Sequence, residues 1–256
     1  MKKLAVLVCA ALAVSLAACS SSKDNAKKDS GKLSGSTTVF AAASLTGTFT
    51  TLGSQFQSAH PGTKVTFNFG GSGTLATQIN QSAPADVFAS AAPKNMQTVV
   101  DAGNANTPAT FVKNTGEIAV APANPQHIAS VADLAKPGVK VALCETTVPC
   151  GVVAGEIFAN AKVTVTATAR EPDVKSTLAV VESGEVDAGI VYVTDVKAAG
   201  SKVVAVPIPA AENATTVYPI ATLKHSKNAA LAQTFVDFVR SSTGQGVLTA
   251  AGFLSP

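Results

Sequence analysis

Apolar residues recur along most of this chain in two alternating patterns. Short apolar or alternating runs predict strands, and apolar residues three or four positions apart predict helices. Residues 37–43 form an apolar run, and residues 45–58 then repeat apolar side chains at helical spacing. The predicted strands are residues 37–43, 65–69, 86–90, 117–121, 139–143, 188–192, 203–208 and 216–223. The predicted helices are residues 45–58, 74–80, 93–102, 152–161, 174–182 and 229–241. Strands separated by helices predict a parallel or mixed α/β sheet.

Chemically notable residues fall where a predicted strand ends or a predicted helix begins. They are Ser44 at an N-cap position, Ser72 in a glycine-rich turn, Cys150 between Pro149 and Gly151, Val174 after a predicted N-cap at Asp173, and Tyr192 followed by a second predicted cap, Thr194. Ligands of α/β sheets bind beyond the strand ends, and a helix start offers unpaired N–H groups to anions. Taken singly, each residue also fits an ordinary cap, turn or packing role. The pattern alone therefore leaves open whether they converge.

The first 35 residues follow a different pattern. A short basic start is followed by mostly apolar residues 4–18, which is typical of a secretory signal and short for a membrane-spanning helix. The segment ends in Leu-Ala-Ala-Cys19, which resembles the bacterial lipobox, so we expect cleavage before Cys19 and lipidation of that residue. An ordinary signal peptide with a chance cysteine is the alternative. Residues 1–18 are thus predicted as signal peptide and residues 19–35 as lipidated cysteine and flexible tether.

Composition and charge narrow the function. Hydrophobic residues make up 46% of the 256 residues and charged residues 14%, which is ample for a buried core. The net charge of +3 comes from the lysine-rich start, because the chain after residue 32 has slightly more acidic than basic residues. Non-specific nucleic-acid binding needs a basic face, so no nucleic-acid partner is expected.

The cysteines agree with export. Cys9 leaves with the predicted signal and Cys19 carries the predicted lipid, which leaves Cys144 and Cys150 as an even pair in an oxidising compartment. We therefore predict a structural disulfide between Cys144 and Cys150. The spacing is not that of a Cys-x-x-Cys redox motif. The histidines lie far apart without metal-ligand spacing, so no direct protein-to-metal ligands are predicted.

Six segments taken in order resemble the molybdate-binding proteins of bacterial ABC transporters. They are residues 39–46 (VFAAASLT), 71–79 (GSGTLATQI), 83–88 (APADVF), 149–151 (PCG), 171–174 (EPDV) and 189–195 (GIVYVTD). The resemblance covers residues 36–256. It implies a type II periplasmic binding protein with two α/β lobes joined by two crossovers, near residues 118–122 and 203–207, and with ligand in the cleft. Lobe one would hold residues 36–117 plus 208–256, and lobe two residues 118–207.

The resemblance also implies an oxyanion site. Ser44 and Ser72 would each offer a hydroxyl and a backbone N–H, Cys150 and Val174 their backbone N–H groups, and Tyr192 its phenol. Cys150 departs from the family, where a small residue such as Ala is usual. Glycines on both sides of Ser72 replace a more serine-rich turn. The implied ligand is molybdate or tungstate, with no cofactor, and the implied partner is a membrane permease that receives the ligand from a monomer on the outer face of the cell membrane.

The donor chemistry favours a fully deprotonated tetrahedral dianion. All five positions can donate hydrogen bonds and none is an ionised acceptor, whereas phosphate near neutral pH keeps a proton that needs an acceptor. Sulfate or another small oxyanion remains the alternative ligand. An enzyme is not expected: the turn around Ser72 lacks the final glycine of G-x-S-x-G, and a Cys150–His hydrolase would need a free thiol.

Overall fold

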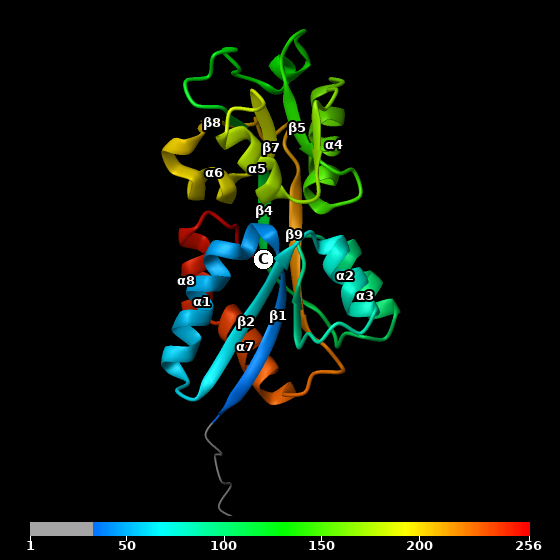
Figure 1. The fold of residues 1–256 in the computed structure, drawn as a ribbon, viewed down its shortest axis with the longest axis vertical. Helices are drawn as coiled ribbons and strands as arrows, with labels where there is room; N and C mark the ends of the chain where they lie inside the picture. The colour runs from blue at the N-terminus through cyan, green and yellow to red at the C-terminus, as the bar shows by residue number, and fades with distance from the viewer. Residues whose placement is uncertain (1–32) are drawn as a thin grey trace, which may run out of the picture. The chain divides into compact units, whose positions relative to one another are not determined.

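The computed structural model describes residues 33–256 (Figure 1). The predicted signal peptide, the lipidation at Cys19 and nearly all of the predicted tether therefore lie outside the described residues.

Strands and helices alternate along the described chain. The strands are β1 Gly35–Ala42, β2 Thr63–Gly70, β3 Val87–Ala89, β4 Ala109–Val120, β5 Val141–Cys144, β6 Ala169–Glu171, β7 Ala188–Tyr192, β8 Val204–Val206 and β9 Thr215–Thr222. The α-helices are α1 Thr46–Ala59, α2 Ser72–Asn80, α3 Pro93–Asp101, α4 Pro149–Ala161, α5 Val174–Glu182, α6 Val193–Ala199, α7 Ala229–Arg240 and α8 Ser242–Ala250. Short 3-10 helices are η1 Ala43–Leu45, η2 Val131–Ala135 and η3 Gly200–Lys202.

The strands form a mixed sheet in the order β2-β1-β3-β9-β4-β7-β5-β6, with β8 paired to β4. Strand β1 pairs in parallel with β2 and β3, and β5 pairs in parallel with β6 and β7. The central strands β9 and β4 run antiparallel to their neighbours. The predicted mixed α/β class is therefore confirmed.

Three hydrophobic cores lie in the described chain, two in lobe one and one in lobe two. The larger core of lobe one gathers phenylalanines, with the ring of Phe49 within 5.9 Å of Phe111 and 6.2 Å of Phe235. The core of lobe two is aliphatic and includes Ile118, Ile157 and other residues between 118 and 214. Figure 1 shows β1, β2, α1 and α7 in one half and β5, β7, α4 and α6 in the other. This is the architecture of a two-lobe type II binding protein.

One long strand belongs to both lobes. Residues 109–115 of β4 pair with β9, and residues 116–120 pair with β7 and β8. The chain returns to lobe one after β8, through β9, which lies beside β4 between the two halves (Figure 1). Two adjacent strands thus connect the lobes.

Several elements differ from the predicted ones. Strand β4 begins at Ala109 instead of residue 117, and α4 begins at Pro149 instead of residue 152. The pattern did not predict β6, α6 or α8. The remaining predicted elements are present, with ends that match the prediction or shift by at most two residues.

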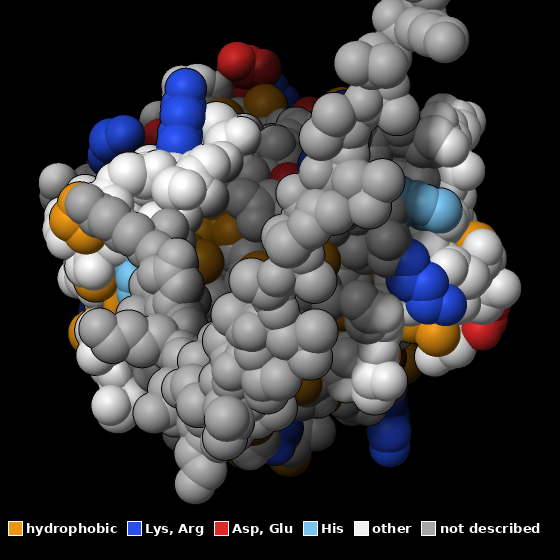
Figure 2. Space-filling view, turned by 90° about the horizontal axis from the view of Figure 1, so that it is seen from below, with side chains coloured by type: hydrophobic (Ala, Val, Ile, Leu, Met, Phe, Trp, Pro, Cys, Tyr) orange, Lys and Arg blue, Asp and Glu red, His pale blue; other side chains and the backbone are white. Residues whose placement is uncertain are grey.

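The surface of the described residues carries few charges. In Figure 2, Lys and Arg side chains stand apart from one another among polar and apolar surface, without a broad basic patch on the described part of this face. Within residues 33–256, no helix combines the length and apolar character needed to cross a membrane.

Candidate oxyanion site

A small pocket between the two lobes brings together all five predicted site residues, Ser44, Ser72, Cys150, Val174 and Tyr192. Lobe one lines it from η1 and the start of α2. Lobe two lines it from the starts of α4 and α5 and from the end of β7. Its other lining residues are Ala42, Ala43, Gly70, Gly71, Ala91, Val148, Pro149 and Asp173.

The size of the pocket limits what it can hold. Its cavity volume is about 20 Å³, only slightly above the roughly 10–15 Å³ that a single water molecule requires. Sugars, amino acids and peptides are far too large for this space. This volume fits a small compact group.

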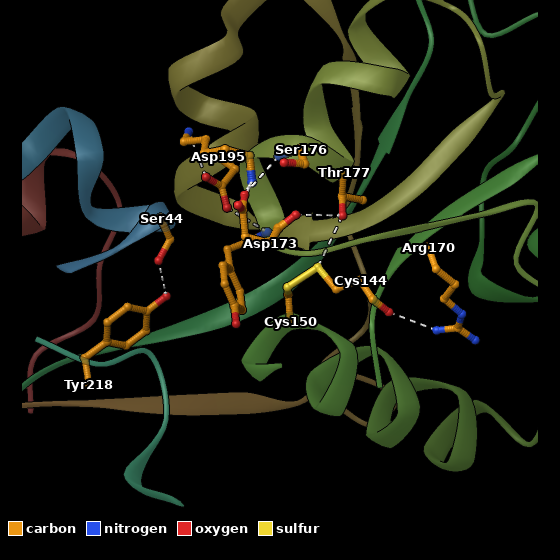
Figure 3. The surroundings of a disulfide bond; sticks show 11 residues. Ser44, Cys144, Cys150, Arg170, Asp173, Ser176, Thr177, Asp195 and Tyr218 are labelled. Carbon is orange, nitrogen blue, oxygen red and sulfur yellow. Dashed lines mark hydrogen bonds and ion pairs between the residues drawn. A yellow bond between two sulfur atoms is a disulfide. The ribbon is translucent and has the colours of Figure 1, made fainter. Parts of the chain in front are cut away.

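Ser44 lies inside η1, which corrects its predicted place as an N-cap. The helix α1 begins two residues later at Thr46, with Leu45 in the cap position and no side-chain cap. The Ser44 hydroxyl instead lies 2.9 Å from the hydroxyl of Tyr218, a buried residue of β9 (Figure 3). The tight 3-10 turn directs this side chain toward the cleft rather than toward the start of α1.

Ser72 is the first residue of α2, and Gly71 takes the cap position. Helix α2 therefore begins two residues earlier than predicted. The Ser72 hydroxyl oxygen accepts a hydrogen bond from the backbone N–H of Ala91 at 3.0 Å. Its own hydrogen stays available for the pocket, and as the first helical residue its backbone N–H has no carbonyl partner within the helix.

Cys150 is the second residue of α4, and its sulfur is bonded to that of Cys144, the last residue of β5 (Figure 3). The bond ties the helix start to the neighbouring strand end. The Cys144 sulfur also lies 3.2 Å from the Thr177 hydroxyl in α5. The loop that carries the Cys150 N–H is therefore joined to both strand β5 and helix α5.

Val174 begins α5, as predicted, with Asp173 as N-cap. One carboxylate oxygen of Asp173 accepts hydrogen bonds from the backbone N–H groups of Lys175 and Ser176, at 2.8 and 3.0 Å. The cap satisfies these two amides and leaves the N–H of Val174 free of an intrahelical partner.

Tyr192 ends β7 as predicted, but it also takes the cap position of α6 that was predicted for Thr194. Its hydroxyl is buried and has no hydrogen-bond partner among the described residues. Burial raises the pKa of Tyr192 well above its usual range, and the nearby Tyr218 and Asp195 raise it further. The phenol therefore stays protonated and can donate to an occupant of the pocket.

Asp195, three residues after Tyr192, binds the backbone of Tyr192. Its carboxylate accepts the Tyr192 backbone N–H at 3.3 Å and lies 2.8 Å from the ammonium of Lys175. Burial raises the pKa of Asp195, and the Lys175 charge opposes that shift. The ion pair links the start of α5, which begins with Val174, to the start of α6, which follows Tyr192.

The pocket has an unusual charge balance for an anion site. None of the residues that line it is Lys or Arg, and Asp173, its one acid, points one oxygen at two backbone amides. The positive potential must come from helix starts, each equivalent to about half a charge, and from neutral hydroxyls. Such donors suit an anion that has no proton of its own to donate.

The sequence pattern missed two residues that act on this site, Tyr218 and Gly71. Tyr218 contacts Ser44 from a strand 174 positions away in the chain. Gly71 lies against the backbone of lobe two: a Cβ atom there would stand 2.7 Å from the Pro172 carbonyl oxygen. Only the resemblance of the glycine-rich turn pointed near Gly71, and no local signal pointed to Tyr218.

Two lobes, a two-strand connection and a donor-lined pocket in the cleft are the features of a substrate-binding protein of the type II class. The chain belongs to the family of bacterial extracellular solute-binding proteins, whose profile matches residues 37–254.

Individual relatives narrow the family. The molybdate-binding protein ModA of Mycobacterium tuberculosis (strain H37Rv) is 42% identical over 253 residues, which cover 98% of this chain and 97% of the relative. This confirms the resemblance found in the sequence segments.

Solved structures share the fold at lower identity. A periplasmic molybdate-binding protein from Azotobacter vinelandii has a TM-score of 0.77 and 21% identity, covering 86% of this chain and 99% of that chain. The sulfate-binding protein SubI from Mycobacterium tuberculosis H37Rv has a TM-score of 0.73 and 19% identity, covering 85% and 86%. Similarity at these identities establishes the shared fold.

Proposed function

We propose that this chain captures molybdate, and tungstate with it, outside the cytoplasm and delivers the anion to an ABC permease. The observation that carries the proposal is the convergence of Ser44, Ser72, Cys150, Val174 and Tyr192, from both lobes, on one small pocket. The name of the Mycobacterium tuberculosis relative, molybdate-binding protein, supports the choice of ligand.

The electrostatics support a fully deprotonated dianion. Burying such an ion is costly unless its oxygens are hydrogen-bonded, and hydrogen bonds to an ionised group contribute most of the compensation. The proposed donors are three hydroxyls and the backbone amides at the starts of α2, α4 and α5. Because no lining residue is a lysine or arginine, the ligand keeps its charge and is held by neutral groups.

Closure of the lobes accompanies binding in this proposal. A ligand that contacts both lobes favours the closed state by the contacts that it makes only there. The division into residues 36–117 plus 208–256 and residues 118–207 stays a prediction. Ile208 and Ala214 pack in the core of lobe two, which favours a second crossover nearer to the start of β9.

Export and anchoring belong to the same proposal. We propose that Cys19 is lipidated after cleavage of residues 1–18, that the exported protein works as a monomer on the outer face of the membrane, and that the Cys144–Cys150 bond is present there. The bonded sulfurs in this structure support the last point and leave Cys150 without the free thiol that a hydrolase would need. Mass analysis of alkylated protein before and after reduction tests it.

Sulfate is the second candidate ligand. It is also a tetrahedral dianion without a proton, so the donor set accepts both, and the fold is shared with a sulfate-binding protein. The difference between them is size, which a pocket of this volume can sense.

Competition calorimetry tests the function directly. The purified residues 33–256 are titrated with molybdate, tungstate, sulfate and hydrogen phosphate at one pH and one ionic strength. We expect molybdate and tungstate to bind tightly, sulfate weakly and phosphate least. Tighter binding of sulfate than of molybdate would assign the chain to sulfate instead. No binding of any of the four would refute the proposed oxyanion site.

A further inference from the structure

We propose that Tyr218 is a positioning residue that fixes the Ser44 hydroxyl as a donor and thereby sets the selectivity of the site against protonated oxyanions. The proposal deepens the oxyanion function proposed above and depends on it. Tyr218 does not line the pocket; it acts through Ser44.

The two lobe-one hydroxyls differ in how their direction is set. Ser72 accepts from the backbone N–H of Ala91. An amide nitrogen in this position can only donate, so the hydrogen of Ser72 is always free to point elsewhere. Ser44 is paired with another hydroxyl, that of Tyr218 at 2.9 Å, and either oxygen could be the donor. Of the two lobe-one hydroxyls that line the pocket, Ser44 is therefore the one whose hydrogen-bond direction is reversible.

The surroundings of Tyr218 favour one of the two directions. Its side chain is fully buried among the rings of Phe111, Tyr192 and Phe253. Burial raises the pKa of Tyr218, so the hydroxyl keeps its hydrogen. The side chains of Asn114 and Tyr192 also lie near this hydroxyl, but among the described residues the bond to Ser44 is the one that meets hydrogen-bond geometry, and the Tyr192 hydroxyl has no partner. If Ser44 donated to Tyr218, the tyrosine hydrogen would be buried without an acceptor, which is costly.

The direction has a consequence for the ligand. When Tyr218 donates to Ser44, the single hydrogen of Ser44 is directed to the pocket, as those of Ser72 and Tyr192 are. A protonated oxyanion such as hydrogen phosphate then meets a donor at each of these three hydroxyls, and none of them accepts its hydrogen. Without the tyrosine hydroxyl, Ser44 could rotate and accept that hydrogen. Tyr218 thus separates proton-free from protonated anions.

The variant Tyr218→Phe tests this by the ratio of two affinities. Calorimetry measures the dissociation constants of molybdate and of hydrogen phosphate at about pH 8, where phosphate carries one proton, with phosphate measured by displacement of molybdate where direct binding is weak. We expect molybdate to bind roughly five- to tenfold more weakly, and the phosphate-to-molybdate ratio of dissociation constants to fall about tenfold or more.

A matched control comes from the same strand. Thr222 is a buried residue of β9 whose hydroxyl accepts from Asn106 at 2.8 Å, and it does not line the pocket. Thr222→Val removes a comparable buried hydroxyl, and we expect both affinities to be unchanged. A tyrosine with a merely structural role would weaken both anions equally in Tyr218→Phe, and an unchanged ratio would overturn the proposal.

A neutron structure of the molybdate complex gives a second test that needs no variant. A hydrogen on the Tyr218 oxygen, directed at Ser44, supports the proposal, and a hydrogen on Ser44 directed at Tyr218 overturns it. The outcomes are separable from failure of the function itself. If the wild-type protein binds none of the oxyanions, the proposed function is wrong. If it binds molybdate and the ratio is unmoved by Tyr218→Phe, only the positioning role is wrong.

Discussion

The two lobes supply the pocket with different balances of side-chain and backbone donors. Lobe one contributes the side-chain hydroxyls of Ser44 and Ser72, each held by a second polar group of the same lobe, and the backbone amide of Ser72 at the start of α2. Lobe two contributes backbone amides at the starts of α4 and α5, together with the phenol of Tyr192, which has no partner among the described residues.

This difference decides how each half of the site can be damaged. A hydroxyl is removed by one substitution with little change to the backbone. A backbone N–H survives every substitution except proline, so it is lost only when the helix start itself is displaced. In lobe two, three contacts hold the helix starts that carry these amides. They are the disulfide at Cys150 and the close backbone contact at Gly151 for α4, and the N-cap Asp173 for α5.

The largest effect is expected from Gly151→Ala, which attacks the amide donors of lobe two. A Cβ atom there would lie 2.0 Å from the Glu145 carbonyl oxygen, so the start of α4 must shift. We expect a loss of roughly 1–3 kcal/mol in the free energy of unfolding and about 100-fold weaker molybdate binding. Gly155→Ala in the same helix, where a Cβ meets nothing within 4 Å, is the control. Affinity is measured by calorimetry and stability by thermal unfolding. Equal affinities and equal stabilities for the two variants would contradict the idea that the position of the α4 start controls binding.

The next effect concerns the contact between the lobes. In Gly71→Ala the new Cβ would meet the Pro172 carbonyl oxygen of the other lobe at 2.7 Å, so the closed state is hindered while each lobe keeps its packing. We expect molybdate binding to weaken by about 1–3 kcal/mol, an unchanged unfolding temperature without ligand, and a larger radius of gyration with molybdate in X-ray scattering. Gly73→Ala, whose Cβ would stand 3.4 Å from the Asn95 side chain, should close as the wild type does. A normal closed radius for Gly71→Ala would refute the idea.

A direct comparison of donor types comes third. Ser44→Ala and Ser72→Ala each remove a side-chain donor, and we expect each to weaken molybdate binding by about 1–3 kcal/mol. Val174→Ala shortens a buried side chain of lobe two but keeps the backbone N–H. We expect it to lower stability by about 1 kcal/mol while affinity, measured by calorimetry, stays within about twofold. Equal losses of affinity in the serine and valine variants would contradict the distinction between side-chain donors in lobe one and backbone donors in lobe two.

The smallest effect is expected from alkaline pH. Because burial raises the pKa of Tyr192, the protonated donor form persists through the region near pH 10 where an exposed tyrosine ionises. Affinity for molybdate should therefore stay nearly constant in calorimetry between about pH 8 and about pH 10.5. A sharp loss near pH 10 would mean that Tyr192 ionises as an exposed phenol does.

The sequence predicted the parts of the fold whose faces are plainly apolar, and it failed where the core-facing positions are polar or glycine. Strand β4 is the clearest case. Its buried positions include Asn114, which donates to the Thr194 hydroxyl at 2.8 Å, and Gly116, which is held by Asn213. No apolar alternation marks these residues, so only the last part of the strand was predicted.

Helix α8 was missed for a related reason. It contains Gly244 and Gly246, which weaken a helical pattern. Gly244 is required there, because a Cβ atom would lie 2.2 Å from the Val239 carbonyl oxygen. Close packing between α7 and α8 therefore selects the residue that the helix pattern treats as a break.

The candidate site shows the same limit. Helix starts and strand ends identified the positions, and the family resemblance indicated that they meet, but the bond from Ser44 to Tyr218 depends on a strand far away in the sequence. Likewise, the contact of Gly71 with Pro172 exists only once two lobes face each other. Neither periodicity nor spacing encodes contacts of this kind.

The side-by-side course of β4 and β9 has a mechanical consequence. Two hydrogen-bonded strands make a thin ribbon, which bends across its thin direction more readily than it shears, because sliding would break the ladder between residues 109–115 of β4 and their partners in β9. This arrangement favours approach of the two halves along a single arc. In the proposed function, groups on opposite walls, such as Ser72 and Val174, would then reach the anion in the same relative alignment each time the lobes close.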